Sequence, residues 1–192
     1  MGDRFEEAQL IYTTEQDSVN RIVRLLRAGN IIVLPCDTIY GLSGLYQSTL
    51  SQLRTLKMGS GEQQFAVLAT MEQAKRLCKV PEVLEQHWPC PLTAILEEHE
   101  GDGKIAIRVP SDPLTIAILE ALGSPIYSTA ANERGFAITH INDIIFMYKE
   151  RVQAIVVNPD KMHDTPSTLI DCTTEPYTLL RCGVYDASSL LF

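Results

Sequence analysis

Polar side chains that could bind a ligand follow a short apolar run near the start of the chain. Residues 31–34 are apolar and rich in β-branched side chains, which predicts a buried strand. Pro35 has no backbone N–H and therefore ends the hydrogen-bond ladder of this strand. Asp37, Thr38 and Tyr40 come next. Ligands bind beyond the carboxyl ends of strands in open α/β sheets, so this segment is a candidate binding edge. The alternative is a Gly/Pro-rich turn that holds a hydrogen-bonded aspartate and a packed tyrosine.

Further polar side chains accompany other apolar segments. The alternation over residues 104–109 predicts a strand whose isoleucines face the core while Arg108 faces the opposite side. Another apolar segment leads into residues 128–132, a polar turn of small side chains. A helix over residues 50–56 delivers Lys57 at its end. A functional site requires these distant segments to gather around one hollow.

Helices and strands alternate along the whole chain, which predicts a mixed α/β protein. The expected helices cover residues 19–26, 50–56, 72–78, 113–122 and a segment that Asn142 or Asp143 caps. Their other caps and stops are Asp17 or Ser18, Gly29, Ser48, Asp112 and Gly123. The expected strands cover residues 31–34, 65–69, 92–96, 104–109, 126–127, 152–157, 167–171 and 177–181. No repeat or composition break interrupts the chain, so we expect a single three-layer domain over residues 1–192 with a twisted mixed sheet.

Composition indicates an ordinary globular protein. Hydrophobic residues make up 45% and charged residues 21% of the 192 residues, unlike the composition of a disordered chain. No apolar run approaches the roughly 20 residues that span a bilayer, and the first residues lack a signal-peptide pattern. We therefore expect a cytoplasmic protein that does not associate with membranes. The net charge of −8 argues against broad, sequence-independent binding of nucleic acid, which needs a basic face.

The cysteines, histidines and clustered acids do not predict a metal site. The five cysteines are odd in number and widely spaced, no C-x-x-C pair occurs, and the four histidines lack ligand spacing. Buried thiols without disulfides are therefore expected. The acidic residues between positions 97 and 102 favour a solvated hairpin loop over a metal site.

Five motifs in collinear order carry a family resemblance. Residues 35–42, Pro-Cys-Asp-Thr-Ile-Tyr-Gly-Leu, are similar to the pattern Pro-Thr-Asp/Glu-Thr-x-Tyr-Gly-Leu. The others are residues 88–93 (Trp-Pro-Cys-Pro-Leu-Thr), 107–110 with the helix after them, 128–132 (Ser-Thr-Ala-Ala-Asn), and 166–171 with 180–183 (Pro-Ser-Thr-Leu-Ile-Asp and Leu-Arg-Cys-Gly). Together, from about residue 17 to residue 183, they resemble the YrdC-like family, the threonylcarbamoyl-AMP synthases of tRNA modification. The resemblance implies the YrdC-like fold.

The resemblance also implies a reaction. Enzymes of this family join L-threonine, bicarbonate (as CO2) and ATP into threonylcarbamoyl-AMP and pyrophosphate. The nitrogen of the amino acid takes up CO2 as a carbamate, whose oxygen attacks the α-phosphate, so cations must meet the triphosphate. Mg²⁺ would come with ATP as a substrate complex, without a tightly bound protein metal. Proteins of tRNA modification are candidate partners.

Three basic residues match family positions. By resemblance, Lys57 and Arg108 are the catalytic candidates, which would neutralise phosphate or carboxylate charge. Arg181 would bind the nucleotide by closing the site over the adenylate. The local alternatives are that Arg108 and Arg181 are exposed strand cations in simple ion pairs, and that Lys57 is a solvated helix-end lysine favoured by the dipole.

Five neutral residues complete the site that the resemblance implies. Thr38 and Tyr40 would lie against the threonine or the carbamate. Ser128, Asn132 and Ser167 would donate hydrogen bonds to the nucleotide. Positioning of this kind supplies much of the rate in such a reaction. The local alternative for Ser167 is a strand-entry hydroxyl that bonds to nearby backbone.

The chain departs from the family pattern where charge matters. Gly59 and Gln63 stand where the family has the arginine of its Lys-x-Arg motif and a second lysine, and Ala130 replaces a serine. Loss of a preorganised cation at a phosphoryl-transfer site lowers the rate by orders of magnitude. Arg54 and Arg134, outside the family positions, are candidate replacements.

Several functions fit these departures. The first is an active or weakly active threonylcarbamoyl-AMP synthase. The second is a catalytically impaired relative that binds a nucleotide or a small acid without turnover, which the missing charges favour. The third is a double-stranded RNA-binding module, against which the acidic balance counts. The fourth is an enzyme with a different amino acid, or with carbamoyl phosphate in place of bicarbonate.

Overall fold

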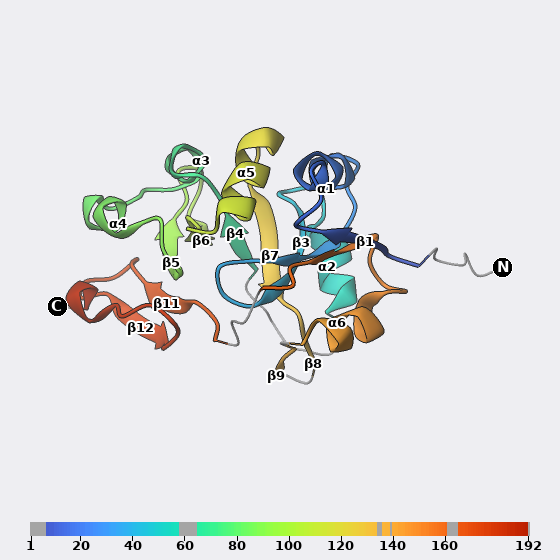
Figure 1. Ribbon diagram of the computed structural model, residues 1–192. Coiled ribbons are helices and arrows are strands. Elements are labelled where there is room, and N and C mark those ends of the chain that lie inside the picture. The colour runs from blue at the N-terminus through green and yellow to red at the C-terminus, as the bar shows by residue number, and fades with distance from the viewer. Residues whose placement is uncertain (1–6, 58–64, 134–135, 139, 161–164, 192) are drawn as a thin grey trace.

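Ten strands form one twisted mixed sheet across the molecule (Figure 1). The computed structural model describes residues 7–57, 65–133, 136–138, 140–160 and 165–191. In spatial order the strands are β1 (Gln9–Tyr12), β10 (Ala154–Val157), β2 (Ile32–Pro35), β3 (Tyr40–Leu45), β7 (Ile126–Ala130), β4 (Ala66–Leu68), β6 (Lys104–Arg108), β5 (Leu92–Glu97), β11 (Thr168–Asp171) and β12 (Thr178–Arg181). A separate short hairpin pairs β8 (Asn132–Glu133) with β9 (Phe136–Ala137). The predicted mixed sheet is confirmed, because β10 is parallel to both of its neighbours while β3 is antiparallel to both of its own.

Helices cover both faces of the sheet and complete three layers. They are α1 (Ser18–Arg27), α2 (Leu50–Leu56), α3 (Met71–Leu77), α4 (Glu82–His87), α5 (Pro113–Leu122) and α6 (Ile141–Tyr148), with a short 3-10 turn, η1 (Ser188–Leu190). Helices α1 and α5 lie side by side (Figure 1) and share one hydrophobic cluster. Residues of α2, α3, α4 and α6 belong to a second cluster. None of the described helices is both long and apolar enough to cross a membrane.

The alternation of side chains along β2 separates the two clusters. Ile32 and Leu34 pack with α1 and α5, whereas Val33 between them packs with the second cluster. None of the three has any exposed surface. Burial of each such side chain stabilises the fold by roughly 1.5–3 kcal/mol. Both faces of the strand are buried, which is why the sequence here is a continuous apolar run.

Helix α5 has the boundaries that its sequence predicts. The Asp112 carboxylate accepts a hydrogen bond from the Thr115 N–H (2.8 Å), which satisfies a donor that the first turn leaves open. Pro113 occupies the first position, where its missing N–H costs nothing. Gly123 ends the helix with a φ of 69°, which other residues adopt only at a cost. The predicted helix over residues 113–122 is confirmed.

Strands form in one segment predicted as a turn and in another for which a turn was the alternative. β3 forms within the segment after Pro35, and β7 extends into the predicted turn over residues 128–132. The glycines of β3 serve packing, because a Cβ at Gly44 would lie 2.4 Å from the Thr49 hydroxyl oxygen. A Cβ at Gly41 would lie 2.5 Å from that of Ser128. Pairing with β2 and β7 on both sides outweighs the low strand propensity of glycine and serine.

Other elements start where the sequence does not predict. The N-cap of α2 is Thr49 and not Ser48, and its hydroxyl donates backwards to a carbonyl oxygen. Helix α6 begins at Ile141 with His140 as N-cap, so Asp143 lies in the first turn. Strand β1 and helix α4 have no predicted counterpart. Both are short, and their sequences carry too few residues for a periodic pattern.

The five cysteines form no disulfide, as expected. Cys36, Cys78 and Cys90 are buried, Cys172 is half-buried and Cys182 is exposed. Burial raises the pKa of the Cys78 thiol to about 12, which keeps it protonated and unreactive. The prediction of buried thiols is therefore right for three positions and wrong for Cys182.

Candidate active site

A cavity of about 340 Å³ lies across seven neighbouring strands, from β3 to β12. Each of these strands contributes at least one lining residue. Six of the eight predicted site residues line it: Thr38, Tyr40, Arg108, Ser128, Ser167 and Arg181. Cavities of this volume hold small-molecule ligands. Segments far apart in the sequence thus gather around one hollow.

Alternation along β6 brings Arg108 into this cavity. Ala106 and Arg108 line the hollow, whereas Ile105 and Ile107 belong to the hydrophobic cluster on the other face. The predicted orientation of Arg108 is confirmed. The side chain is not an exposed strand cation, because only 4% of the residue is accessible to solvent.

The cavity has two walls that differ in their place in the sheet. The inner wall consists of Thr38, Tyr40, Gly41, Arg108 and Ser128. The outer wall consists of Pro166, Ser167, Leu169 and Arg181. The inner wall stands on β3, β6 and β7 and on the connection into β3, within the sheet, whereas the outer wall stands on β11, the segment before it and the edge strand β12.

In the inner wall, Arg108 is held by two side chains. Its Nη2 lies 3.3 Å from Asp37 Oδ1, and its Nη1 donates a hydrogen bond to Thr38 Oγ1 (3.1 Å). Asp37 is held in turn by Ser111, whose N–H donates to Oδ2 (3.2 Å). A buried guanidinium needs such a partner, since an unpaired buried charge is strongly unfavourable.

Two polar atoms of this pair lack a hydrogen bond within the described structure. They are Arg108 Nε and Asp37 Oδ1, both buried. Asp37 Oδ1 contacts the guanidinium as an ion pair without hydrogen-bond geometry. Most buried polar atoms are hydrogen-bonded, and exceptions are common at functional sites. The pair therefore keeps hydrogen-bonding capacity next to the cavity.

Hydroxyl groups form the rest of the inner wall. The Ser128 hydroxyl, on β7, lies close to Gly41 of the neighbouring strand β3. The Tyr40 hydroxyl donates to the Asn158 carbonyl oxygen (3.4 Å) and accepts from the Asn158 N–H (3.3 Å). Burial raises the pKa of Tyr40, so its phenol stays protonated and neutral. These groups can donate to or accept from a polar ligand, but they add no charge.

In the outer wall, Ser167 connects Arg181 to β5. The Ser167 and Thr93 hydroxyl oxygens are 2.8 Å apart. Arg181 donates from Nη2 to Ser167 Oγ (3.1 Å) and from Nε to the Ser167 carbonyl oxygen (3.0 Å). Partial burial of the guanidinium, together with the positive charge of Arg108, lowers the pKa of Arg181. Two cations thus influence each other across one cavity, and an anion between them would relieve their repulsion.

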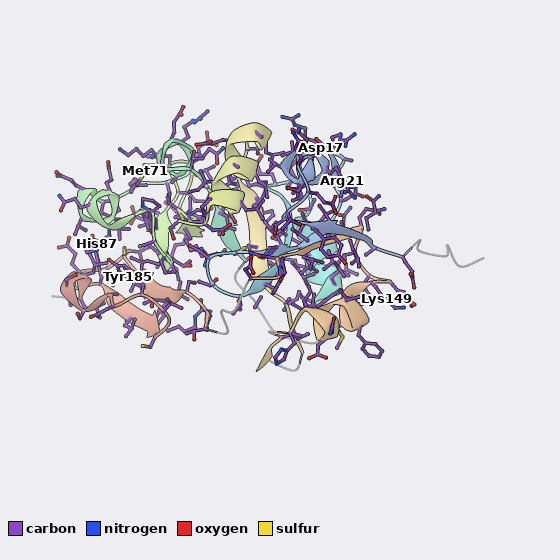
Figure 2. All side chains as sticks on the ribbon, in the orientation of Figure 1. Asp17, Arg21, Met71, His87, Lys149 and Tyr185 are labelled. Atoms are coloured by element: carbon purple, nitrogen blue, oxygen red, sulfur yellow. The ribbon has the colours of Figure 1, made fainter. Side chains whose placement is uncertain are left out.

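The segment after β12 fastens the outer wall. Thr168 Oγ1 donates to the Tyr185 carbonyl oxygen (2.6 Å) and accepts from the Gly183 N–H (3.1 Å). The Tyr185 hydroxyl pairs with His87 at the end of α4, and Figure 2 shows the two side chains together at the C-terminal end of the molecule. A Cβ at Gly183 would lie 2.4 Å from the backbone of residues 166–168. The C-terminal segment therefore packs directly behind Ser167.

Comparison with known proteins places the chain in a family. The family model Sua5/YciO/YrdC, described as "Telomere recombination", matches residues 24–183. The chain belongs to this family. The match spans most of the chain, so the resemblance drawn from the five motifs is confirmed.

Curated family members differ in how much of their length this chain covers. A threonylcarbamoyl-AMP synthase of Pyrococcus abyssi is 26% identical over 175 residues, which cover 82% of this chain and 52% of the relative. The uncharacterized protein YciO of Escherichia coli is 25% identical over 194 residues, which cover 92% of this chain and 94% of the relative. The chain thus spans about half the length of the archaeal synthase and nearly the whole length of YciO.

Solved structures of family members share the fold. The crystal structure of E. coli YciO superposes with a TM-score of 0.87 at 24% identity, covering 96% of this chain and 100% of YciO. The structure of P. abyssi Sua5 complexed with L-threonine has a TM-score of 0.84 at 22% identity, covering 96% of this chain and 60% of Sua5. These likenesses confirm the YrdC-like fold.

Lys57, the lysine of the family's Lys-x-Arg motif, does not line the cavity. It ends α2, only 9% of the residue is exposed, and its Nζ donates to the Ala130 carbonyl oxygen (2.8 Å). Burial, followed by the positive charge of Arg151, lowers the pKa of Lys57 to about 8. The alternative of a solvated helix-end lysine is wrong. Since Ala130 itself lines the cavity, the ammonium group lies behind the cavity rim.

Other predicted family positions lie outside the described residues or outside the cavity. Asn132 contributes its backbone to β8, and its side chain is outside the part that the structure describes. Gly59, Gln63 and Arg134 also fall outside the described ranges. Arg54 is exposed on α2 and does not line the cavity, so it does not replace the missing cation there.

Three residues of the site received no role from the sequence, although Asp37 was named as part of the candidate binding edge. Asp37 lies in the first polar segment and in a family motif, and its pairing with Arg108 could have been anticipated from charge alone. Thr93 closes the motif over residues 88–93, which was a usable signal. Ser111 has no signal beyond its place before the cap of α5, because only the tertiary fold brings it to Asp37.

Proposed function

We propose that this chain forms threonylcarbamoyl-AMP from L-threonine, bicarbonate and ATP. The observation that carries the proposal is a single cavity in which two guanidinium groups, Arg108 and Arg181, stand among serine and threonine hydroxyls. Guanidinium groups bind carboxylates and phosphates by charge-assisted hydrogen bonds. Relatives named threonylcarbamoyl-AMP synthase support the choice of reaction.

The proposed reaction assigns a role to each wall. A carbamate oxygen attacks the α-phosphorus, and pyrophosphate leaves with the electron pair of the broken P–O bond. Arg108 and Arg181 would neutralise the charge that accumulates on the phosphates. Thr38 and Tyr40 would lie against the amino acid, while Ser128 and Ser167 would fix the nucleotide. Most of the catalysis would come from positioning and charge neutralisation.

Mg²⁺ would be held mainly by the phosphates of ATP. Among the described residues, no group of three His, Cys, Asp or Glu side chains could hold a metal ion. The Asp37 carboxylate, beside the cavity, already faces Arg108 and Ser111. Mg²⁺ is commonly bound through substrate phosphates with only one or two protein ligands. The magnesium ion therefore belongs to the substrate complex in this proposal.

A second candidate function is nucleotide binding without turnover. Lys57 favours it, because the ammonium of this motif lysine is bonded to the Ala130 backbone and does not line the cavity. The two neutral residues at Gly59 and Gln63 favour it as well. On this view the cavity retains its arginines for binding but lacks the cations that accelerate phosphoryl transfer.

Pyrophosphate release separates the two candidates. We expect the chain to release pyrophosphate from MgATP only when L-threonine and bicarbonate are both present. ATP affinity is measured in parallel by calorimetry. ATP binding without release supports the second candidate, whereas absence of both binding and release contradicts both candidates.

Restoring the family charges tests the same proposal by gain of activity. The variant Gly59→Arg with Gln63→Lys should release pyrophosphate at least about tenfold faster, because each cation at such a site is worth several kcal/mol. A matched control is Ser51→Arg with Gln52→Lys, which adds the same charge on the exposed face of α2. Equal acceleration in both variants would mean that net charge alone causes the effect.

A further inference from the structure

Asp37 lies next to Arg108, with only 7% of its side chain exposed. It does not line the cavity itself, so it cannot be assigned to substrate binding by contact. We infer that Asp37 is a positioning residue, which fixes the guanidinium of Arg108 in one place beside the cavity, where an anionic ligand would meet it. The ligand class, a phosphate or carboxylate group, rests on the function proposed above.

The position of Asp37 is set by two distant parts of the chain. It lies in the connection between β2 and β3, and its Oδ2 accepts from the N–H and from the hydroxyl of Ser111 (3.2 and 3.5 Å). Ser111 immediately precedes Asp112, the N-cap of α5. A carboxylate held at one oxygen by a helix start can keep its other oxygen at a constant place beside Arg108.

Arg108 is therefore fixed at two of its three nitrogens. Nη2 faces Asp37 and Nη1 donates to Thr38, while Nε has no hydrogen bond within the described structure. A planar guanidinium held in this way cannot rotate without breaking an ion pair in a buried setting. Preorganisation of this kind lowers the entropy lost when a ligand binds.

A second aspartate–arginine pair, exposed to solvent, serves as a comparison for the buried pair of Asp37 and Arg108. Asp17 Oδ2 and Arg24 Nη2 are 3.4 Å apart at α1, where Figure 2 labels Asp17 at the outer surface. Their side chains are 59% and 71% exposed, against 7% and 5% for Asp37 and Arg108. Exposed pairs of this kind contribute little and exchange freely with water. Asp17 is thus a matched control for Asp37.

The first measurement is made on the wild-type protein, and variants serve only to assign its signals. In ¹⁵N-detected spectra, rotation of the Arg108 guanidinium about its Nε–Cζ bond should be slow, and that of Arg24 should be fast. Arg108→Lys and Arg24→Lys assign the two signals. Fast rotation of Arg108 in the unliganded protein overturns the inference, whether or not the protein turns over any substrate.

The second measurement is affinity for inorganic pyrophosphate and for ATP by calorimetry. Asp37→Asn should weaken both by roughly 10- to 100-fold, the loss typical of a misplaced binding group. Asp17→Asn should leave both unchanged. Unchanged affinity in Asp37→Asn, with the unfolding temperature preserved, overturns the inference.

A double-variant cycle shows whether Asp37 acts through Arg108. In the Arg108→Lys background, Asp37→Asn should change the pyrophosphate affinity by less than about twofold, because the effects of substitutions at coupled residues are not additive. Equal losses in both backgrounds would give Asp37 an independent role and overturn the inference. If the wild-type protein binds neither ligand, the proposed function fails, and the rotation measurement still decides the role of Asp37.

Discussion

The two walls of the cavity present the same cation in opposite settings. Arg108 of the inner wall comes from β6, is buried, and has an aspartate as counter-ion. Arg181 of the outer wall comes from β12, the last strand of the sheet, in which all four residues are exposed. Its partner is the neutral Ser167. One arginine is built into the core, and the other is held over the cavity from an edge.

Because Arg108 is buried with a counter-ion and Arg181 is not, we expect the first to matter for the stability of the fold and the second for ligand affinity. A buried ion pair that loses one partner leaves an uncompensated charge, which destabilises the whole fold. Arg181, on an exposed edge strand and only partly buried, has no charged partner that its removal would leave uncompensated, so we expect its loss to weaken ligand binding more than stability. Both walls line the same hollow, yet we expect variants in them to have different consequences.

The largest expected effect is that of Arg108→Met. It leaves the Asp37 carboxylate buried without its cation, so the free energy of unfolding should fall by about 3–5 kcal/mol. Urea denaturation measures this loss. The double variant Asp37→Asn with Arg108→Met should recover part of it, since the buried charge is then gone. A loss below about 1 kcal/mol in the single variant would show that the inner wall is not part of the stable core.

The converse prediction concerns Arg181→Ala. ATP affinity should fall by about tenfold or more, because a hydrogen-bonding cation is worth roughly 1.5–3 kcal/mol, while stability changes by less than about 1 kcal/mol. Arg181→Lys should recover only part of the affinity, since an ammonium cannot reproduce the fork that contacts Ser167. Calorimetry and thermal unfolding measure the two quantities. A stability loss equal to that of Arg108→Met would erase the contrast between the walls.

The sequence predicts which residues form the inner wall better than it predicts the strands that carry them. Alternation over residues 104–109 is enough to turn Arg108 away from the core. The motif over residues 35–42 marks Thr38 and Tyr40. Yet β3, which carries Tyr40 into the wall, looks like a turn because it contains two glycines. Its strand character comes from pairing with β2 and β7, which no local pattern encodes.

Contacts between distant segments were beyond sequence reasoning. The Ser111 N–H reaches Asp37 only because α5 starts beside the β2–β3 connection. Likewise, Lys57 follows its helix as predicted, but the position of its ammonium depends on where β7 ends, at Ala130. Motif matching identifies which residues belong to a site. Whether a long side chain such as that of Lys57 enters the cavity or lies behind its rim is decided by tertiary packing.

A third prediction tests how tightly the inner wall is packed. Gly41→Ala places a Cβ 2.5 Å from Ser128 Oγ and 3.3 Å from the Thr129 carbonyl oxygen. We expect a loss of about 1–2 kcal/mol in stability, in the lower part of the range for overpacking, because the serine hydroxyl can rotate. Adding Ser128→Ala should restore stability but not ligand affinity. If stability stays low in the double variant, the Thr129 backbone is the main obstacle.

The smallest expected effect concerns Lys57, behind the rim of the inner wall. Because its pKa is lowered to about 8 in the folded protein, from 10.5 in the unfolded chain, the unfolded state binds more protons between these values. The free energy of unfolding should therefore rise as pH increases from about 8 to about 10.5, and fall again on return to pH 8. Lys57→Met should remove this contribution, which we expect to be about 1 kcal/mol after solvent screening.

Denaturation of wild type and Lys57→Met at pH 7.5 and at pH 10 isolates the contribution of Lys57, because all other titrating groups are common to both proteins. Arg151→Met refines the test. Its positive charge is the second cause of the lowered pKa, after burial, so its removal should shrink the pH dependence without abolishing it. An identical pH dependence in wild type and Lys57→Met would mean that the ammonium is fully solvated. In that case Lys57 would be mobile enough to reach a ligand in the cavity, and the inner wall would gain the cation that its structure now places behind the rim.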